Sequence, residues 1–68
     1  MFTVMKNNAN DELIEDKSFN TLRSAIRRAE YLQEKGNEWV EINEDGVTVW
    51  DASEGLFEEF HNKYPEFA

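Results

Sequence analysis

The sequence predicts an α+β fold, a small antiparallel sheet with one long central helix (β-β-α-β-β) and a short C-terminal helix. Three observations support it. Apolar residues recur at helical spacing in the middle of the chain, strand-like runs flank that segment, and aromatic residues form 13% of the chain, which is enough for a core. At 68 residues the chain is expected to form a single domain, 1–68.

The N-terminal segment predicts a hairpin. Phe2 and Val4 lie in one short apolar run, and Leu13 and Ile14 lie in the next. Between them, residues 7–11 read Asn-Asn-Ala-Asn-Asp, a string of turn formers. We therefore expect two strands joined by this turn.

The central helix is predicted over residues 21–35, where one apolar stripe has helical spacing. The residues of the stripe are Leu22, Ala25, Ile26, Ala29 and Leu32. Thr21 or Asn20 is a suitable N-cap, and Gly36 stands where a left-handed residue often ends a helix. The small alanines in the stripe would let the helix approach a sheet closely.

A second hairpin is predicted around Asp45-Gly46, because glycine tolerates the positive φ that tight turns require. We expect an even number of loop residues, since only then do the apolar residues of both strands share a face. The residues expected on that face are Val40, Ile42, Val47 and Val49. The residues expected on the opposite face are Trp39, Glu41, Thr48 and Trp50.

The C-terminal segment predicts a short amphipathic helix that Asp51 or Ser53 caps and Pro65 ends. Its apolar residues are Leu56, Phe57, Phe60 and Tyr64. If this helix covers Trp39 and Trp50, the two tryptophans belong to a second small core. If it packs elsewhere, they form an exposed aromatic patch with an acidic rim, as in many protein interfaces.

Charge is the property that bears most on function. Fifteen Asp and Glu against seven Lys and Arg give a formal net charge of −8, and the pI is near 4.4. A negative field of this size repels nucleic acid and anionic lipid, and it speeds encounter with basic protein surfaces. We therefore expect a basic protein partner and no direct binding to nucleic acid or membrane.

Few residues are suited to catalysis or cofactor binding. The chain has no cysteine and a single histidine, His61, so neither a nucleophilic dyad nor a histidine-based metal site can be assembled. Its three glycines are scattered and form no phosphate-binding loop. The oxygen-rich segment 43–46 lacks the ligand spacing of a calcium loop. We therefore expect that the protein is not an enzyme and that it binds neither a cofactor nor a metal ion.

Acidic residues follow the hairpins and the C-terminal segment. Alternate carboxylates on a strand are about 6.6 Å apart, and those one turn apart on a helix are separated by about 5.4 Å. Rows at such intervals can engage the lysines and arginines that normally hold phosphates. The carboxylates expected to contact a partner are Glu41, Glu44, Asp45, Glu54, Glu58 and Glu59. Tyr31 and Trp39 are candidate anchors, and acidity that serves solubility alone is the alternative.

The segment from Phe19 to Trp50 resembles small proteins of phages and mobile elements. The residues that carry the resemblance are Phe19, Thr21, Leu22, Ala25, Ala29 and Leu32, then Val40, Ile42, Asp45, Gly46, Val49 and Trp50. Together with its acidity and size, the chain looks like the acidic anti-CRISPR inhibitors that imitate DNA and block target recognition by a CRISPR surveillance complex. The resemblance implies a viral inhibitor in the cytoplasm of a bacterial host cell, and no binding motif is carried over residue by residue.

Other functions are compatible with the same features. An antitoxin or nuclease inhibitor would neutralise a basic enzyme, and a non-catalytic accessory module would use the aromatic face for association. The helix carries the basic cluster Arg23, Arg27 and Arg28, which a uniform DNA mimic would lack. The mimic surface would then be confined to the hairpins and the C-terminal segment, in a monomer or weak homodimer.

Overall fold

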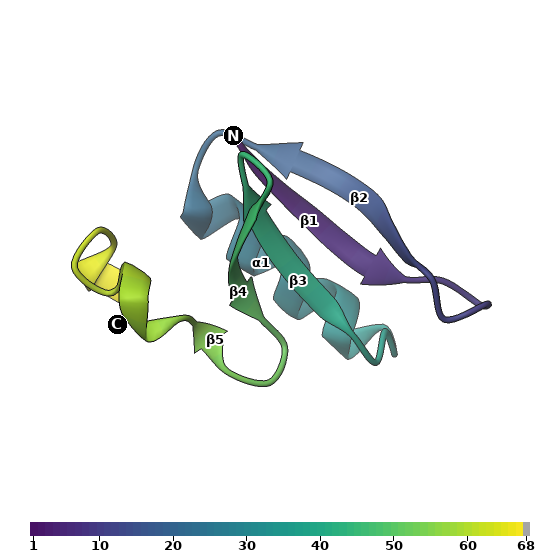
Figure 1. The fold of residues 1–68 in the computed structure, drawn as a ribbon. Helices are drawn as coiled ribbons and strands as arrows, with labels where there is room; N and C mark the ends of the chain where they lie inside the picture. Colours follow the sequence, from purple (N-terminus) through teal and green to yellow (C-terminus); the bar gives the residue numbers. More distant parts are fainter. Residues whose placement is uncertain (68) are drawn as a thin grey trace.

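A computed structural model describes residues 1–67 and has the expected α+β architecture (Figure 1). The elements are β1 (Phe2–Asn7), β2 (Leu13–Phe19), α1 (Leu22–Glu34), β3 (Val40–Glu44), β4 (Val47–Asp51), β5 (Gly55–Leu56) and the 3₁₀ turns η1 (Glu58–Phe60) and η2 (Pro65–Phe67). The predicted β-β-α-β-β order is confirmed. Among the residues described, no helix has the length and apolar character needed to cross a membrane.

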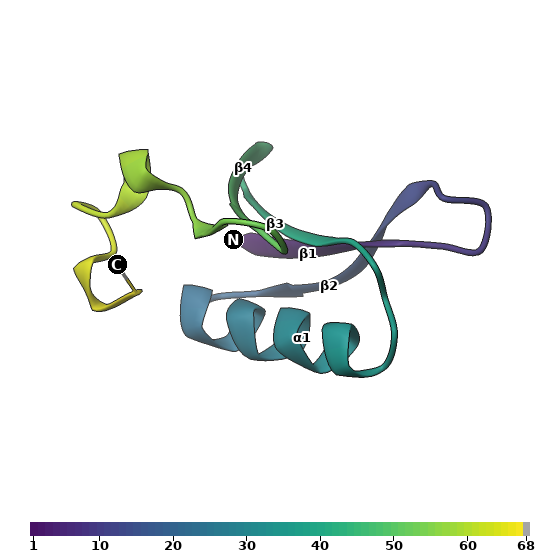
Figure 2. The ribbon, with the colours of Figure 1, turned by 90° about the horizontal axis from the view of Figure 1, so that it is seen from below.

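The sheet is antiparallel, with strand order β2-β1-β3-β4-β5. The two predicted hairpins therefore join through β1 and β3. Helix α1 lies against one face of this sheet, and no helix covers the other face within residues 1–67 (Figure 2). We call the uncovered side the open face.

Helix α1 begins and ends where the sequence predicts. The Thr21 hydroxyl accepts a hydrogen bond from the backbone N–H of Ser24 at 3.2 Å, which satisfies one free donor of the first turn. Gly36 follows the helix with a φ of 101°, the left-handed conformation that glycine adopts at low cost. Ala25 and Ala29 are fully buried, so the helix backbone lies close to the sheet.

The core lies between α1 and the sheet. Its buried apolar residues are Phe2, Val4, Leu22, Ala25, Ala29, Leu32, Val40, Ile42, Val49, Trp50 and Leu56. Burial of each large side chain in this set contributes about 1.5–3 kcal/mol relative to exposure. The fold of a chain this small therefore depends strongly on a few of them.

The β3–β4 hairpin has the predicted even loop, because Glu44 pairs with Val47 across the two residues Asp45 and Gly46. Both loop residues have positive φ, 50° and 88°, as the tight turns that suit the twist of a hairpin require. Strict alternation fails further along the hairpin. The register shifts between Ile42 and Asn43, so β4 carries one extra residue there.

This bulge corrects the prediction for Trp50. Because Trp50 pairs with Ile42, it lies on the helix side of the sheet and is only 8% exposed. Val40, Ile42 and Val49 are buried as expected, whereas Val47 at the hairpin tip is 56% exposed. The two tryptophans therefore do not share a face.

The prediction of an amphipathic helix in the C-terminal segment is wrong, because a short strand and two 3₁₀ turns occur there. The Asp51 carboxylate accepts hydrogen bonds from the backbone N–H groups of Ser53 and Glu54, at 3.0 and 2.8 Å. These bonds hold a tight turn, and Gly55 follows with a φ of 71°. The chain then folds back as β5, in which Leu56 pairs with Trp50. Only single 3₁₀ turns follow, so residues 57–67 form an irregular segment with no amphipathic helix.

Candidate protein-binding surface

The basic side chains are confined to the helix side of the molecule and the C-terminal segment. Lys6 pairs with Val40, and Lys17 pairs with Val4, so both lysines lie on the side of the sheet that holds the core. The remaining basic residues are Arg23, Arg27, Arg28 and Lys35 on or next to α1, and Lys63 near the C-terminus. Over residues 1–67, the open face therefore carries no lysine or arginine.

Asp16 is held inside the molecule. A bulge in β2 gives this strand one extra residue at Asp16, whose side chain is 6% exposed. Its carboxylate accepts two hydrogen bonds from Arg28, at 2.6 and 3.0 Å, and lies 3.5 Å from the ammonium of Lys6. The hydrogen bonds from Arg28 lower the pKa of Asp16 below its ordinary value of 3.8. One arginine of the predicted basic cluster is thus part of the fold.

Glu44, one of the expected contact residues, is also bound by other residues of this chain. The Tyr64 hydroxyl donates a hydrogen bond of 2.7 Å to its carboxylate, and the Lys63 ammonium lies 3.1 Å away. The side chain of Glu44 is only 18% exposed. Burial raises the pKa of Tyr64, and the hydrogen bond to Glu44 raises it further. Glu44 therefore anchors the C-terminal segment.

Most of the other carboxylates have no such role. Asp45 at the exposed hairpin tip lies 3.3 Å from the N-terminal ammonium, and Glu66 lies 3.0 Å from Arg23. The Asp51 carboxylate holds the turn before β5, and among the described residues the remaining acidic side chains form no ion pair or hydrogen bond. They are Asp11, Glu12, Glu15, Glu30, Glu34, Glu38, Glu41, Glu54, Glu58 and Glu59. The acidic excess is therefore free to meet a partner.

Two predicted residues lie together on the open face. Strand register places one row of side chains across this face, in the order Glu15, Met5, Glu41 and Asp51. Trp39 precedes Glu41 by two residues and is 36% exposed, and its backbone is hydrogen-bonded to Asn7 at 3.1 Å. Trp39 and Glu41 thus face the same side of the sheet.

The next row of the open face is polar. It contains Ser18, Thr3, Asn43 and Thr48. The Thr3 and Ser18 hydroxyls are hydrogen-bonded at 3.0 Å, and the Thr48 hydroxyl donates to Asn43 at 2.8 Å. These bonds connect the polar side chains in pairs beside the acidic row.

The sequence pattern alone missed Glu15 and Met5. Alternation from Ile14 is interrupted by the bulge at Asp16, which places Glu15 and Lys17 on opposite faces. No glycine or proline marks that bulge in the sequence. Glu15 could have been found only from the pairing of β2 with β1.

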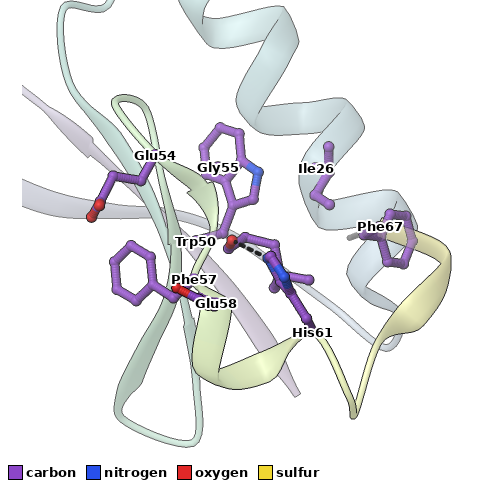
Figure 3. Close-up of a pocket in the computed structure, with 9 residues that line it drawn as sticks. Ile26, Trp50, Glu54, Gly55, Phe57, Glu58, His61 and Phe67 are labelled. Atoms are coloured by element: carbon purple, nitrogen blue, oxygen red, sulfur yellow. Dashed lines mark hydrogen bonds between the residues drawn. The ribbon is translucent and has the colours of Figure 1, made fainter.

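A second acidic surface surrounds a pocket of about 570 Å³ between α1 and the C-terminal segment (Figure 3). The residues that line it are Ile26, Trp50, Glu54, Gly55, Leu56, Phe57, Glu58, His61 and Phe67. It contains two of the expected contact residues, Glu54 and Glu58, whereas Glu59 is exposed outside it. The His61 Nε2 atom lies 3.0 Å from the Leu56 carbonyl, which fixes the imidazole against β5.

Tyr31 lies apart from both surfaces. Its ring is on α1, next to the guanidinium of Arg28 at 5.1 Å and the ammonium of Lys35 at 5.5 Å. The cations of this chain thus already occupy the ring. As an anchor, Tyr31 would bring a partner to the basic side of the molecule.

No protein-family model matches this chain, and neither a curated protein nor a solved structure matches it. Over residues 1–67, no group of three or more histidine and carboxylate side chains is placed to hold a metal ion.

Of the expected contact residues, the structure places Glu41 and Trp39 on the open face, and Glu54 and Glu58 at the pocket. These two surfaces are the candidates for partner binding.

Proposed function

We propose that this protein is a phage-type inhibitor of the anti-CRISPR kind. It would bind a basic nucleic-acid-binding surface of a host CRISPR effector complex and block DNA recognition by occlusion. The observation that carries this proposal is the separation of charge. The open face presents unpaired carboxylates and no lysine or arginine among the described residues, whereas the basic side chains lie elsewhere.

The open face has the composition of a protein contact surface. Glu15 and Glu41 lie on either side of Met5, two strand spacings or about 9.6 Å apart. Trp39 stands beside this row and is partly exposed. Methionine and tryptophan are enriched where proteins meet, and the flanking carboxylates would meet lysines or arginines of the partner.

The same arrangement disfavours association of two copies through this face. Stacked open faces would bring the acidic rows together without a basic side chain between them, and such like-charge contacts are costly. A basic partner instead neutralises Glu15 and Glu41 and covers Trp39. Attraction of this kind also speeds encounter, which suits an inhibitor that must reach its target before DNA does.

A plaquing assay tests the function. The chain is expressed in a panel of bacterial strains, each with one DNA-targeting CRISPR system, and each strain is challenged with a targeted phage. We expect the plaquing efficiency to rise in at least one strain. The purified chain should then prevent that effector complex from shifting its target DNA on a gel.

Charge reversal on the open face supplies the variant and its control. The double substitution Glu15→Lys and Glu41→Lys should abolish the rise in plaquing. Glu30→Lys with Glu34→Lys changes the net charge equally on α1 and should preserve the rise. The proposal would be rejected if the two variants gave the same plaquing efficiency. It would also be rejected if the wild type raised the plaquing efficiency in no strain. Rescue of cells that express a basic nuclease, without an effect on plaquing, would favour the antitoxin function.

A further inference from the structure

The pocket beside β5 is built largely from rings. Trp50, Phe57 and Phe67 line it together with the imidazole of His61, and Ile26 of α1 completes its apolar wall. In Figure 3, Trp50 and His61 lie between Ile26 and Phe67 on one side and Glu54 and Phe57 on the other. Trp50 is held firmly, since it is 8% exposed and its backbone pairs with both β3 and β5. A flat ligand group would thus meet a prearranged set of ring faces and edges.

The charged residues of the pocket are all acidic. Glu54 and Glu58 line it, and the lining contains no lysine or arginine. Neither carboxylate forms an ion pair or hydrogen bond with any residue in the range 1–67. The group that complements both the rings and the carboxylates is a cation with an apolar stem.

We propose that this pocket receives an arginine side chain of the partner protein. This inference rests on the proposed function, because a basic partner supplies the arginine. A guanidinium is planar, stacks on aromatic rings, and donates two parallel hydrogen bonds to a carboxylate. A lysine ammonium offers neither the flat face nor the paired donors, and it is more strongly hydrated. The pocket therefore selects arginine over lysine.

The chain already holds one of its own arginines in this manner. The guanidinium of Arg23 lies 5.4 Å from the centre of the Phe67 ring and 3.0 Å from the Glu66 carboxylate. Phe67 lines the neighbouring cavity that contains Arg23, and it also lines the pocket beside β5. The pocket beside β5 likewise combines aromatic rings with carboxylates, and no lysine or arginine of this chain lines it.

The two tryptophans allow the pocket to be tested without the partner. The indole N–H signal of Trp50 reports on the pocket, and that of Trp39 reports on the open face; the Trp39→Phe variant assigns the two signals. The ¹⁵N-labelled chain is titrated with N-acetyl-arginine amide, with N-acetyl-lysine amide and with the neutral isostere N-acetyl-citrulline amide. We expect arginine to shift the Trp50 signal saturably, lysine to do so more weakly, and citrulline not to do so.

The carboxylates are tested by Glu54→Gln with Glu58→Gln, which keeps the size of both exposed side chains. This variant should bind the arginine amide at least about tenfold more weakly, because hydrogen bonds to charged groups are lost. The matched control, Glu30→Gln with Glu34→Gln on α1, should bind as the wild type does. An unchanged wild-type Trp50 signal, an equal response to citrulline, or full binding by the double variant would overturn the inference.

Failure of the pocket and failure of the proposed function give different results. If the pocket takes no arginine, the wild type still raises plaquing and reversal of Glu15 and Glu41 still abolishes the rise. If the proposed function is wrong, plaquing does not change in any strain, while the Trp50 signal still responds to the arginine amide.

Discussion

Ile42 and Trp50 are cross-strand partners in the β3–β4 hairpin, and this pairing places the tryptophan against the helix side of the sheet. The bulge that creates the pairing also separates Trp50 from Trp39. One tryptophan becomes part of the core and of a pocket wall, while the other remains at the open face. A single extra residue in β4 thus places two similar side chains on opposite faces of the sheet.

The tryptophans should respond differently to the same substitution. Trp50→Phe removes part of a buried ring system and should lower the free energy of unfolding by about 1–2 kcal/mol. Trp39→Phe should change it by less than about 0.5 kcal/mol, because Trp39 is partly exposed. Urea unfolding followed by circular dichroism measures both. Equal losses would mean that Trp39 is as deeply packed as Trp50.

The sequence was sufficient wherever local chemistry determines structure. The apolar stripe from Leu22 to Leu32, the Thr21 cap and the Asp45-Gly46 turn each agree with the structure, because a few neighbouring residues decide them. The faces of β2 and β4 depend on bulges whose position is set by packing against other strands. No glycine or proline marks those bulges, so the prediction for Trp50 was wrong and Glu15 was missed.

The C-terminal segment shows a conflict between two local signals. The spacing of Leu56, Phe60 and Tyr64 favours a helix, but the hydrogen bonds to Asp51 hold a turn over residues 51–54 instead. Leu56 pairs with Trp50 and is buried in the core, only 7% exposed. The path of the chain after this turn also determines one of the candidate surfaces. Glu54 and Glu58 meet at one pocket because the chain reverses there.

The ion pair of Asp16 with Arg28 should make stability depend on acid pH. The pKa of Asp16 is lower in the folded state than its ordinary value of 3.8, chiefly because Arg28 donates hydrogen bonds to it. The stabilisation is therefore complete above about pH 4 and is lost as the pH falls through the folded-state value. Asp16→Asn should lower the free energy of unfolding by about 1 kcal/mol at neutral pH.

The pH course of this difference is the informative measurement. Urea unfolding of the wild type and of Asp16→Asn should converge as the pH falls below about 4. Glu12→Gln is a suitable control, because Glu12 is exposed and its side chain has no partner over residues 1–67. A difference that persists at the lowest pH would show that the carboxylate charge of Asp16 contributes little.

Alkaline pH should loosen the C-terminal segment. Burial and the hydrogen bond to Glu44 raise the pKa of Tyr64 above its ordinary value of 10.0. A raised acid pKa adds stability that is complete below about pH 10 and is lost as the pH rises through the folded-state value. Tyr64→Phe should cost about 1 kcal/mol at neutral pH, and its difference from the wild type should shrink as the pH rises through the folded-state pKa of Tyr64. Tyr31→Phe should change the free energy of unfolding little at neutral pH, because Tyr31 is exposed.

The tight turn between β3 and β4 should be sensitive to substitution of Gly46. Gly46 has a φ of 88°, so Gly46→Ala should lower the free energy of unfolding by about 1 kcal/mol through backbone strain. Asp45→Asn should be nearly neutral, because asparagine tolerates the left-handed region at least as well as aspartate. Thermal unfolding of both variants would reveal the contrast. Full tolerance of alanine at position 46 would mean that the turn can take another form.

Glu41 and Glu44 lie three residues apart on β3. Substitution of Glu41 should affect inhibition, whereas substitution of Glu44 should affect stability. Glu41→Gln should weaken inhibition and leave the free energy of unfolding within about 0.5 kcal/mol of the wild type, because its carboxylate has no partner within residues 1–67. Glu44→Gln should lower stability by about 1 kcal/mol, since Tyr64 and Lys63 lose a charged acceptor. It should still inhibit at temperatures where it is folded. Plaquing and urea unfolding of both variants give the comparison, and a stable Glu44→Gln that fails to inhibit would place Glu44 in the contact surface.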